Sequence, residues 1–135
     1  MMSEMLAPYA GLLTASFVLA VLVLIQVLVQ DFAGIKAKHV PGMPVMTGHK
    51  DFHFRTVRAH ANTNENLPLW LLTVALAVAL GANPAWSANA AWLFAAARLG
   101  HMTFYYLDQR LARSIAFGLS LTAQIALIVV CGLAL

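Results

Sequence analysis

The stretch that decides the fold is residues 55–68, RTVRAHANTNENLP, which stands directly in front of the apolar run LWLLTVALAVAL at residues 69–80. This stretch holds two arginines, a histidine, three asparagines and a glutamate, although the whole chain is 61% hydrophobic and only 10% charged. Such a concentration of polarity at the start of an apolar segment indicates either a solvated helix end or a polar site built into a membrane protein.

The composition argues against a water-soluble globule, because soluble domains carry about 25% charged residues. With 135 residues and a mean hydropathy of +0.79, the chain is typical of an integral membrane protein with one domain over residues 1–135. A helix needs about 20 apolar residues to cross a bilayer. Four segments are predicted to do so, the second by including the polar turns in front of its short apolar part. They are residues 7–29, 55–80, 85–106 and 114–135.

The class of membrane fold follows from the pattern of these segments. They lack the strict alternation of a barrel strand, so we predict an all-α, up-down bundle of four transmembrane helices. The first segment follows the acidic leader MMSEML and exceeds the apolar core of a signal peptide, so we expect a retained span. The single cysteine, Cys131, excludes an internal disulfide and is expected to pack in the core. The histidines show no metal-ligand spacing, and no bound metal is expected.

The basic residues predict the topology, since they surround only the first and third predicted loops. They are Lys36, Lys38, Lys50, Arg55 and Arg58 in one group, and Arg98, Arg110 and Arg113 in the other. By the positive-inside rule both basic loops face the cytoplasm, and both termini and the second loop lie outside. The isoelectric point of about 9.4 therefore requires no nucleic acid as a partner. The first loop, residues 30–50, is expected to be irregular because it contains HVPGMP.

Three predicted helices each carry a narrow polar stripe near the cytoplasmic end, as placement at about 100° per residue shows. The second helix contributes Arg55, Arg58, Asn62 and Glu65, joined by Asp51; the third contributes Arg98, His101, Tyr105 and Asp108; the fourth contributes Arg113, Ser120 and Gln124, with Ser114 offset. His60 points away from its stripe, and Gln124 is expected to link helices. The loop histidines His39, His49 and His53 receive no role.

Ionisable groups at membrane depth cost about 2.5–3.5 kcal/mol each, so these stripes should face the bundle interior or a wet cavity. One explanation is an internal network in which Glu65 neutralises an arginine and Asn62 ties helices together. The other is a ligand site, since arginines outnumber carboxylates on the stripes and a guanidinium binds a carboxylate bidentately. Glu65 would then suit a ligand that also carries an ammonium group.

The motif RAHANTNENLP, with Arg58, Asn62, Glu65 and Pro68, resembles the MAPEG family, the membrane-associated proteins of eicosanoid and glutathione metabolism. The segments RLGHMTFYY and Arg113-Ser114 support the resemblance, which covers essentially the whole chain and is strongest to short bacterial members. It implies a homotrimer of four-helix subunits in the bacterial cytoplasmic membrane, in contact with lipid. Glutathione, as cosubstrate and without a metal, would bind between neighbouring subunits near the cytoplasmic face.

The resemblance also implies roles for individual residues. The residues expected to hold glutathione are Arg55, Arg58, His60, Asn62, Glu65, Arg98, His101, Tyr105 and Arg113. Those expected in catalysis are Arg113, which would stabilise the thiolate, and Ser114 or Tyr105, which would donate a hydrogen bond to it. The activity implied is that of a glutathione transferase or peroxidase acting on hydrophobic electrophiles or lipid hydroperoxides.

Two departures from the family pattern favour a detoxifying or orphan member over an eicosanoid-making one. Residues 29–34 read VQDFAG where eicosanoid-making members place an arginine, and Phe117 lacks a hydroxyl. The alternative within the same family is a lipid-binding scaffold without enzymatic activity. A small multidrug exporter is disfavoured because it would need a carboxylate in residues 7–29, which contain none.

Overall fold

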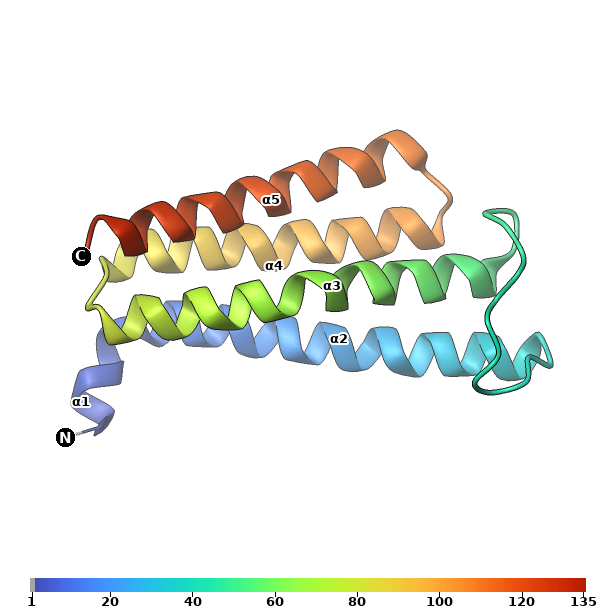
Figure 1. Cartoon of the computed structure of the whole chain (residues 1–135), viewed down its shortest axis with the longest axis horizontal. Coiled ribbons are helices and arrows are strands. Elements are labelled where there is room, and N and C mark those ends of the chain that lie inside the picture. The colour runs from blue at the N-terminus through green and yellow to red at the C-terminus, as the bar shows by residue number, and fades with distance from the viewer. Residues whose placement is uncertain (1) are drawn as a thin grey trace.

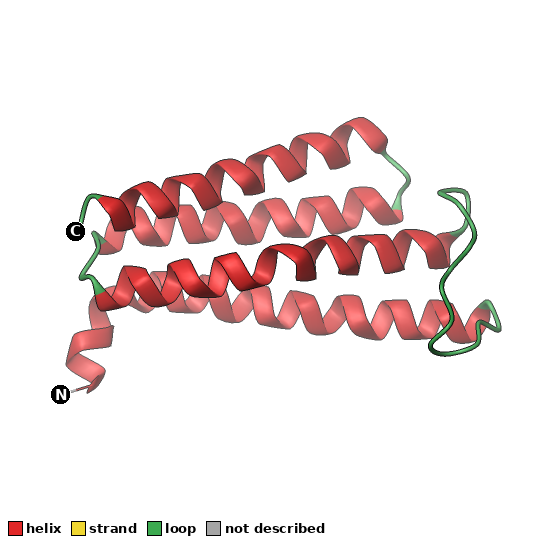
Figure 2. Ribbon diagram, viewed as in Figure 1, coloured by secondary structure: helices red, strands yellow, loops and turns green. Residues whose placement is uncertain are grey.

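The computed structural model describes residues 2–135, which form helices joined by turns and one longer loop, without a strand (Figure 2). The elements are α1 (Met2–Leu6), the short 3-10 helix η1 (Ala7–Tyr9), α2 (Ala10–Lys36), α3 (Phe52–Ala79), α4 (Pro84–Tyr106) and α5 (Arg110–Gly132). The four long helices run side by side in alternating directions (Figure 1). The predicted all-α, up-down order of four helices is thus confirmed.

The two ends of the bundle differ in what they carry. Both termini and the short α3–α4 turn lie at one end, while the 37–51 loop and the α4–α5 turn lie at the other (Figure 1). The second end also holds the start of α3, the end of α4 and the start of α5. All three predicted polar stripes therefore meet there, together with both basic loops.

Two helices are long and apolar enough to cross a membrane by length and composition. They are Glu4–Lys36, which takes in the end of α1, η1 and α2, and Arg110–Gly132, which is α5. Helices α3 and α4 are of similar length but carry the polar residues of two stripes, and α4 packs against the other three long helices. The more polar helices are thus placed against the more apolar ones.

The prediction of an irregular loop from residue 30 was wrong over residues 30–36, which continue α2. Nothing in QDFAGIK removes a backbone donor, and the next prolines after this segment are Pro41 and Pro44. The chain leaves the helix at Lys38, whose φ of 53° is left-handed. His53, also assigned to the loop, instead lies buried in the first turn of α3.

The core near the termini is held by close packing and a few polar links. Trp70 of α3 stacks on Phe94 of α4 with ring centroids 4.1 Å apart. A Cβ at Gly11 would lie 2.9 Å from Ala88 Cβ, so α2 and α4 make a close small-residue contact of the kind that is common between membrane helices.

The predicted link between helices through Gln124 of α5 is also present. Gln124 donates to Thr73 Oγ1 of α3 at 2.7 Å, which confirms its role in joining helices. Cys131 is buried, as expected of a packing residue. The half of the bundle that carries the termini is therefore closed by small and apolar side chains. One buried side-chain amide, that of Gln124, links two of its helices.

Asp51 caps α3 and does not join its polar stripe, which corrects the sequence-based placement. Its backbone is extended at ψ 127°, so the residue lies outside the helix, and its carboxylate accepts from the His53 amide at 3.0 Å. The Thr47 hydroxyl donates to the same carboxylate at 2.6 Å. This hydrogen bond from Thr47 is the main reason that the pKa of Asp51 is lowered below 3.8.

Replacing Asp51 with alanine should lower the free energy of unfolding by about 1 kcal/mol, because the first amides of α3 lose their acceptor. Since folding lowers the pKa of Asp51, its contribution is present above the ordinary carboxyl pKa and is lost as the pH falls through the lowered value. Asp51→Asn keeps an acceptor but does not titrate. The thermal unfolding midpoints of wild type and Asp51→Asn should therefore converge on acidification; parallel pH curves would contradict this.

Candidate functional site

A fully buried arginine lies where the polar stripes meet. Arg98 of α4 has an exposed fraction of 0%. Its guanidinium donates to Asn62 Oδ1 at 2.8 Å and Thr63 Oγ1 at 2.9 Å, both in α3, and to Ser120 Oγ of α5 at 3.4 Å. Buried cations normally need such partners, because desolvation of the charge is otherwise very costly.

The network extends to the remaining long helix through Thr63. The Gln26 side chain of α2 donates to Thr63 Oγ1 at 3.1 Å, so one connected set of hydrogen bonds joins α2, α3, α4 and α5. Sequence reasoning missed Gln26 and Thr63. The signal for Gln26 was available, because it is the only amide side chain within residues 7–29.

This arrangement gives the internal-network explanation a different form. The buried charge is held by neutral amide and hydroxyl groups, and Asn62 does tie α3 to α4 as that explanation required. Glu65, expected to neutralise an arginine, is exposed on α3 and acts on Arg98 through its charge, without taking part in these hydrogen bonds. Arg98, expected to hold a ligand, makes its hydrogen bonds to side chains of α3 and α5 in this single chain.

A cavity of about 200 Å³ opens beside this network, between α3, α4 and α5. Its lining residues are Asn62, His101, Tyr105, Arg113, Ser114 and Phe117. Five of these six were predicted as site residues from the sequence, and the sixth, Phe117, was noted for its missing hydroxyl. The structure therefore brings together, on three helices, side chains that lie up to 55 residues apart in the sequence, from Asn62 to Phe117.

The wall of this polar cavity is an aromatic and cationic stack. The Arg113 guanidinium carbon lies 4.2 Å from the centroid of the Tyr105 ring, within the range of a cation–π interaction. The His101 ring meets the Tyr105 ring edge to face, with centroids 5.1 Å apart, and the centroid of the Phe117 ring lies 6.2 Å from that of His101. Arg113 thus places a positive charge at the cavity without a carboxylate in the lining.

The two hydroxyl groups of the cavity differ in availability. Ser114 Oγ donates to the Arg110 carbonyl of its own helix at 3.0 Å. Within the described chain the Tyr105 hydroxyl donates to no acceptor, although its ring is buried. Tyr105 therefore has the free proton donor, and Ser114 would first have to release Arg110.

The other predicted ligand residues lie outside the cavity in the single chain. Arg55 donates to the carbonyls of His49 at 2.6 Å and Tyr106 at 3.3 Å, and so ties the loop to α4. His60 pairs with Asn64 of its own helix at 2.9 Å. Arg58 and Glu65 are exposed on the face of α3 that also carries Asn62.

His49, which received no role from the sequence, contacts the cavity wall. Its ring stacks against Tyr105 with centroids 6.1 Å apart, and its Nδ1 lies 3.4 Å from Arg113 Nη1. A loop residue of this kind has no periodicity that would assign it to a face. The available signal was its place just before the Asp51 cap, at the polar end of the bundle.

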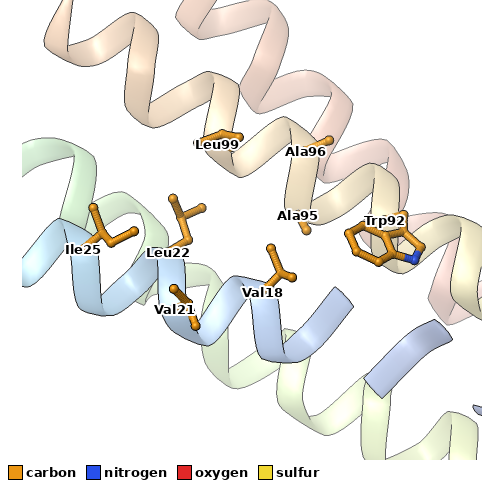
Figure 3. Close-up of a pocket in the computed structure, with 8 residues that line it drawn as sticks. All are labelled: Val18, Val21, Leu22, Ile25, Trp92, Ala95, Ala96 and Leu99. Carbon is orange, nitrogen blue, oxygen red and sulfur yellow. The ribbon is translucent and has the colours of Figure 1, made fainter. Parts of the chain in front are cut away.

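A second hollow, of about 300 Å³, lies between α2 and α4 and differs in chemistry (Figure 3). Its lining residues are Val18, Val21, Leu22, Ile25, Trp92, Ala95, Ala96 and Leu99. None of them carries an ionisable or nucleophilic group, so this hollow offers no reactive side chain. Across residues 2–135 no group of three or more His, Cys, Asp or Glu side chains is placed to hold a metal ion.

Comparison with known proteins assigns this architecture. The model of the MAPEG family matches residues 6–133, which include all four long helices and every residue of the polar cavity. A comparison with curated proteins found no match.

Replacing Arg98 with alanine should lower the free energy of unfolding by at least about 2 kcal/mol, because Asn62, Thr63 and Ser120 lose their buried partner. Arg58→Ala is the matched control, since Arg58 is exposed and outside this network. The thermal unfolding midpoint in detergent, followed by helical circular dichroism, should fall for the first variant and stay near wild type for the second. Equal midpoints would argue against a structural role for Arg98.

Proposed function

The chain belongs to the MAPEG family of membrane proteins, and from this premise we propose that it is a membrane-bound glutathione transferase. The observation that carries the proposal is the polar cavity, in which Arg113 and Tyr105 form one wall. The substrates would be hydrophobic electrophiles and lipid hydroperoxides, in keeping with a family of glutathione and eicosanoid metabolism.

The proposed chemistry is activation of the glutathione thiol. A free thiol has a pKa of about 8.5, and a neighbouring guanidinium favours the thiolate, which is the nucleophile. Arg113 would supply that charge, and the Tyr105 hydroxyl would donate a hydrogen bond to the sulfur. Tyr105 suits this task better than Ser114, because the Ser114 proton is already given to the Arg110 carbonyl.

Two outcomes are open to the thiolate. With a carbon electrophile, the sulfur forms a C–S bond, the leaving group departs with its electron pair, and the thiol proton passes to solvent. With a hydroperoxide, the sulfur attacks the terminal oxygen, the O–O bond breaks, and the alkoxide takes up a proton. A second glutathione then displaces water from the resulting sulfenic acid to give the disulfide.

The size of the cavity supports a site completed by a second copy of the chain. Ligand pockets usually enclose about 300–1,000 Å³, whereas this cavity encloses about 200 Å³. Arg58 and Glu65 are exposed next to it on α3. In a homotrimer, a subunit boundary at this face would let them hold the carboxylate and ammonium groups of glutathione.

We further propose that all four long helices span the membrane. Helices α3 and α4 lie alongside α2 and α5 over most of their length (Figure 1), so a bilayer that surrounds the two apolar helices also surrounds these. Burial of Arg98 inside the bundle keeps its charge away from lipid. The basic loops would place the polar cavity at the cytoplasmic face of a bacterial membrane.

A lipid-binding scaffold is the second candidate, and the apolar hollow between α2 and α4 favours it (Figure 3). Its wholly apolar lining suits an acyl chain. The transferase remains the better supported function, because the scaffold gives no task to the free donor of Tyr105 or to Arg113.

Glutathione should bind to the purified protein saturably, and Arg58→Ala and Glu65→Ala should each weaken binding at least about fivefold, because each removes a charge-assisted contact. Isothermal titration calorimetry measures this directly. Arg110→Ala is the matched control, since Arg110 is exposed at the same end and lies outside the cavity lining. Folded wild type that takes up no heat with glutathione would favour the scaffold.

Removing the Arg113 charge should lower turnover with chlorodinitrobenzene about 100-fold, because the thiolate loses its electrostatic partner. The affinity for glutathione should change much less. Tyr105→Phe should lower turnover in the same direction, and Ser114→Ala should have the smaller effect. The ultraviolet absorbance of the bound thiolate reports the same step without an electrophile. A parallel loss of affinity and turnover in Arg113→Ala would speak against this division of roles.

A further inference from the structure

His49 makes three kinds of contact at the polar end of the bundle, each with a different helix. Its ring stacks against Tyr105 of α4, and its edge-to-face partner is Phe54 of α3 at 5.1 Å. Its Nδ1 faces Arg113 Nη1 of α5 at 3.4 Å. The residue is half-buried although it belongs to the 37–51 loop.

The contact with Arg113 identifies which imidazole nitrogen is the acceptor. A guanidinium carries only donors, so His49 Nδ1 must accept, and the ring proton of the neutral imidazole must be on Nε2. The hydrogen bond therefore exists only while Nδ1 carries no proton. An imidazolium at this position would turn an acceptor into a donor that faces another donor.

The backbone of His49 is anchored independently of its ring. The His49 carbonyl accepts from Arg55 Nη1 at 2.6 Å, and the other Arg55 nitrogen bonds the Tyr106 carbonyl at the end of α4. Two residues later, Asp51 caps α3. The ring is thus presented to Arg113 from a segment that two hydrogen-bonded residues hold in place.

Arg113 has few other restraints. Its guanidinium rests on the Tyr105 ring, and a long side chain held by one face contact keeps much of its rotamer freedom. The Nδ1 acceptor adds a second point of attachment, at the edge of the guanidinium. From these contacts we propose that His49 is a positioning residue that holds Arg113 over Tyr105 for activation of the thiol.

The inference rests on the proposed function and adds a loop residue to it. The groups that face His49 are Arg113 from α5, Tyr105 from α4 and Arg55 from α3, while the nearby Asp51 carboxylate is engaged with Thr47 and the His53 amide. No carboxylate therefore competes with the His49 ring for the Arg113 guanidinium among these contacts.

The test compares His49→Leu and His49→Asn, with Met46→Ala as a control in the same loop, because Met46 is 87% exposed. Asparagine can place its amide oxygen near the position of Nδ1 and so keeps the acceptor. With glutathione and chlorodinitrobenzene, His49→Leu should lower kcat about tenfold with little change in KM for glutathione. His49→Asn should restore most of kcat.

A second readout needs no glutathione. Hydrogen–deuterium exchange of residues 44–51 should be faster in His49→Leu than in wild type, and near wild type in His49→Asn and Met46→Ala. Wild-type kcat in His49→Leu would overturn the inference. If wild type itself neither binds nor turns over glutathione, the proposed function fails with the catalytic part of the inference. Exchange then decides the contact: faster exchange in His49→Leu alone upholds it, and equal exchange refutes it.

Discussion

The burial of one guanidinium is the constraint around which the polar end of this bundle is organised. Arg98 has no exposed surface, and its guanidinium donates to Asn62 and Thr63 of α3 and to Ser120 of α5. Thr63 in turn takes the Gln26 amide and brings α2 into the same network. These hydrogen bonds form only if the four helices keep fixed positions along the bundle axis. The network therefore also fixes the axial positions of the residues one turn closer to the loops, where the cavity opens.

Helical periodicity predicted correctly which residues share a helix face. It did not predict which of them are buried between helices and which line the cavity. It placed His101 and Tyr105 on one face of α4, and the structure finds both at the cavity beside Asn62, Arg113 and Ser114. It could not distinguish Arg98 from these residues, because all three lie on the same face of α4. Arg98 is only one turn from His101, yet its side chain contacts neighbouring helices, whereas that of His101 lines the cavity. Arg98 makes the hydrogen bonds of the buried network, and its role as a ligand contact stays a prediction.

The parts of the fold that the sequence did not predict lie where the helical period ends. Asp51 falls in line with the α3 stripe by angle, yet its extended backbone makes it a cap. The left-handed conformations of Lys38 and Gly42 set the course of the 37–51 loop, and neither follows from hydrophobic pattern. The position of His49 against Tyr105 and Arg113 depends on that course, so it could be seen only in three dimensions.

The α4–α5 turn has a consequence for the order in which the site assembles. Tyr105 and Arg113 stand on either side of a short turn that contains Asp108 in the left-handed region, and they meet as soon as these two helices pair. Contacts this close in sequence cost little loop-closure entropy. Asn62 and His49 arrive from much earlier in the chain, so the α4–α5 hairpin is a local unit that can form its cationic–aromatic pair during insertion, before the rest of the bundle docks onto it.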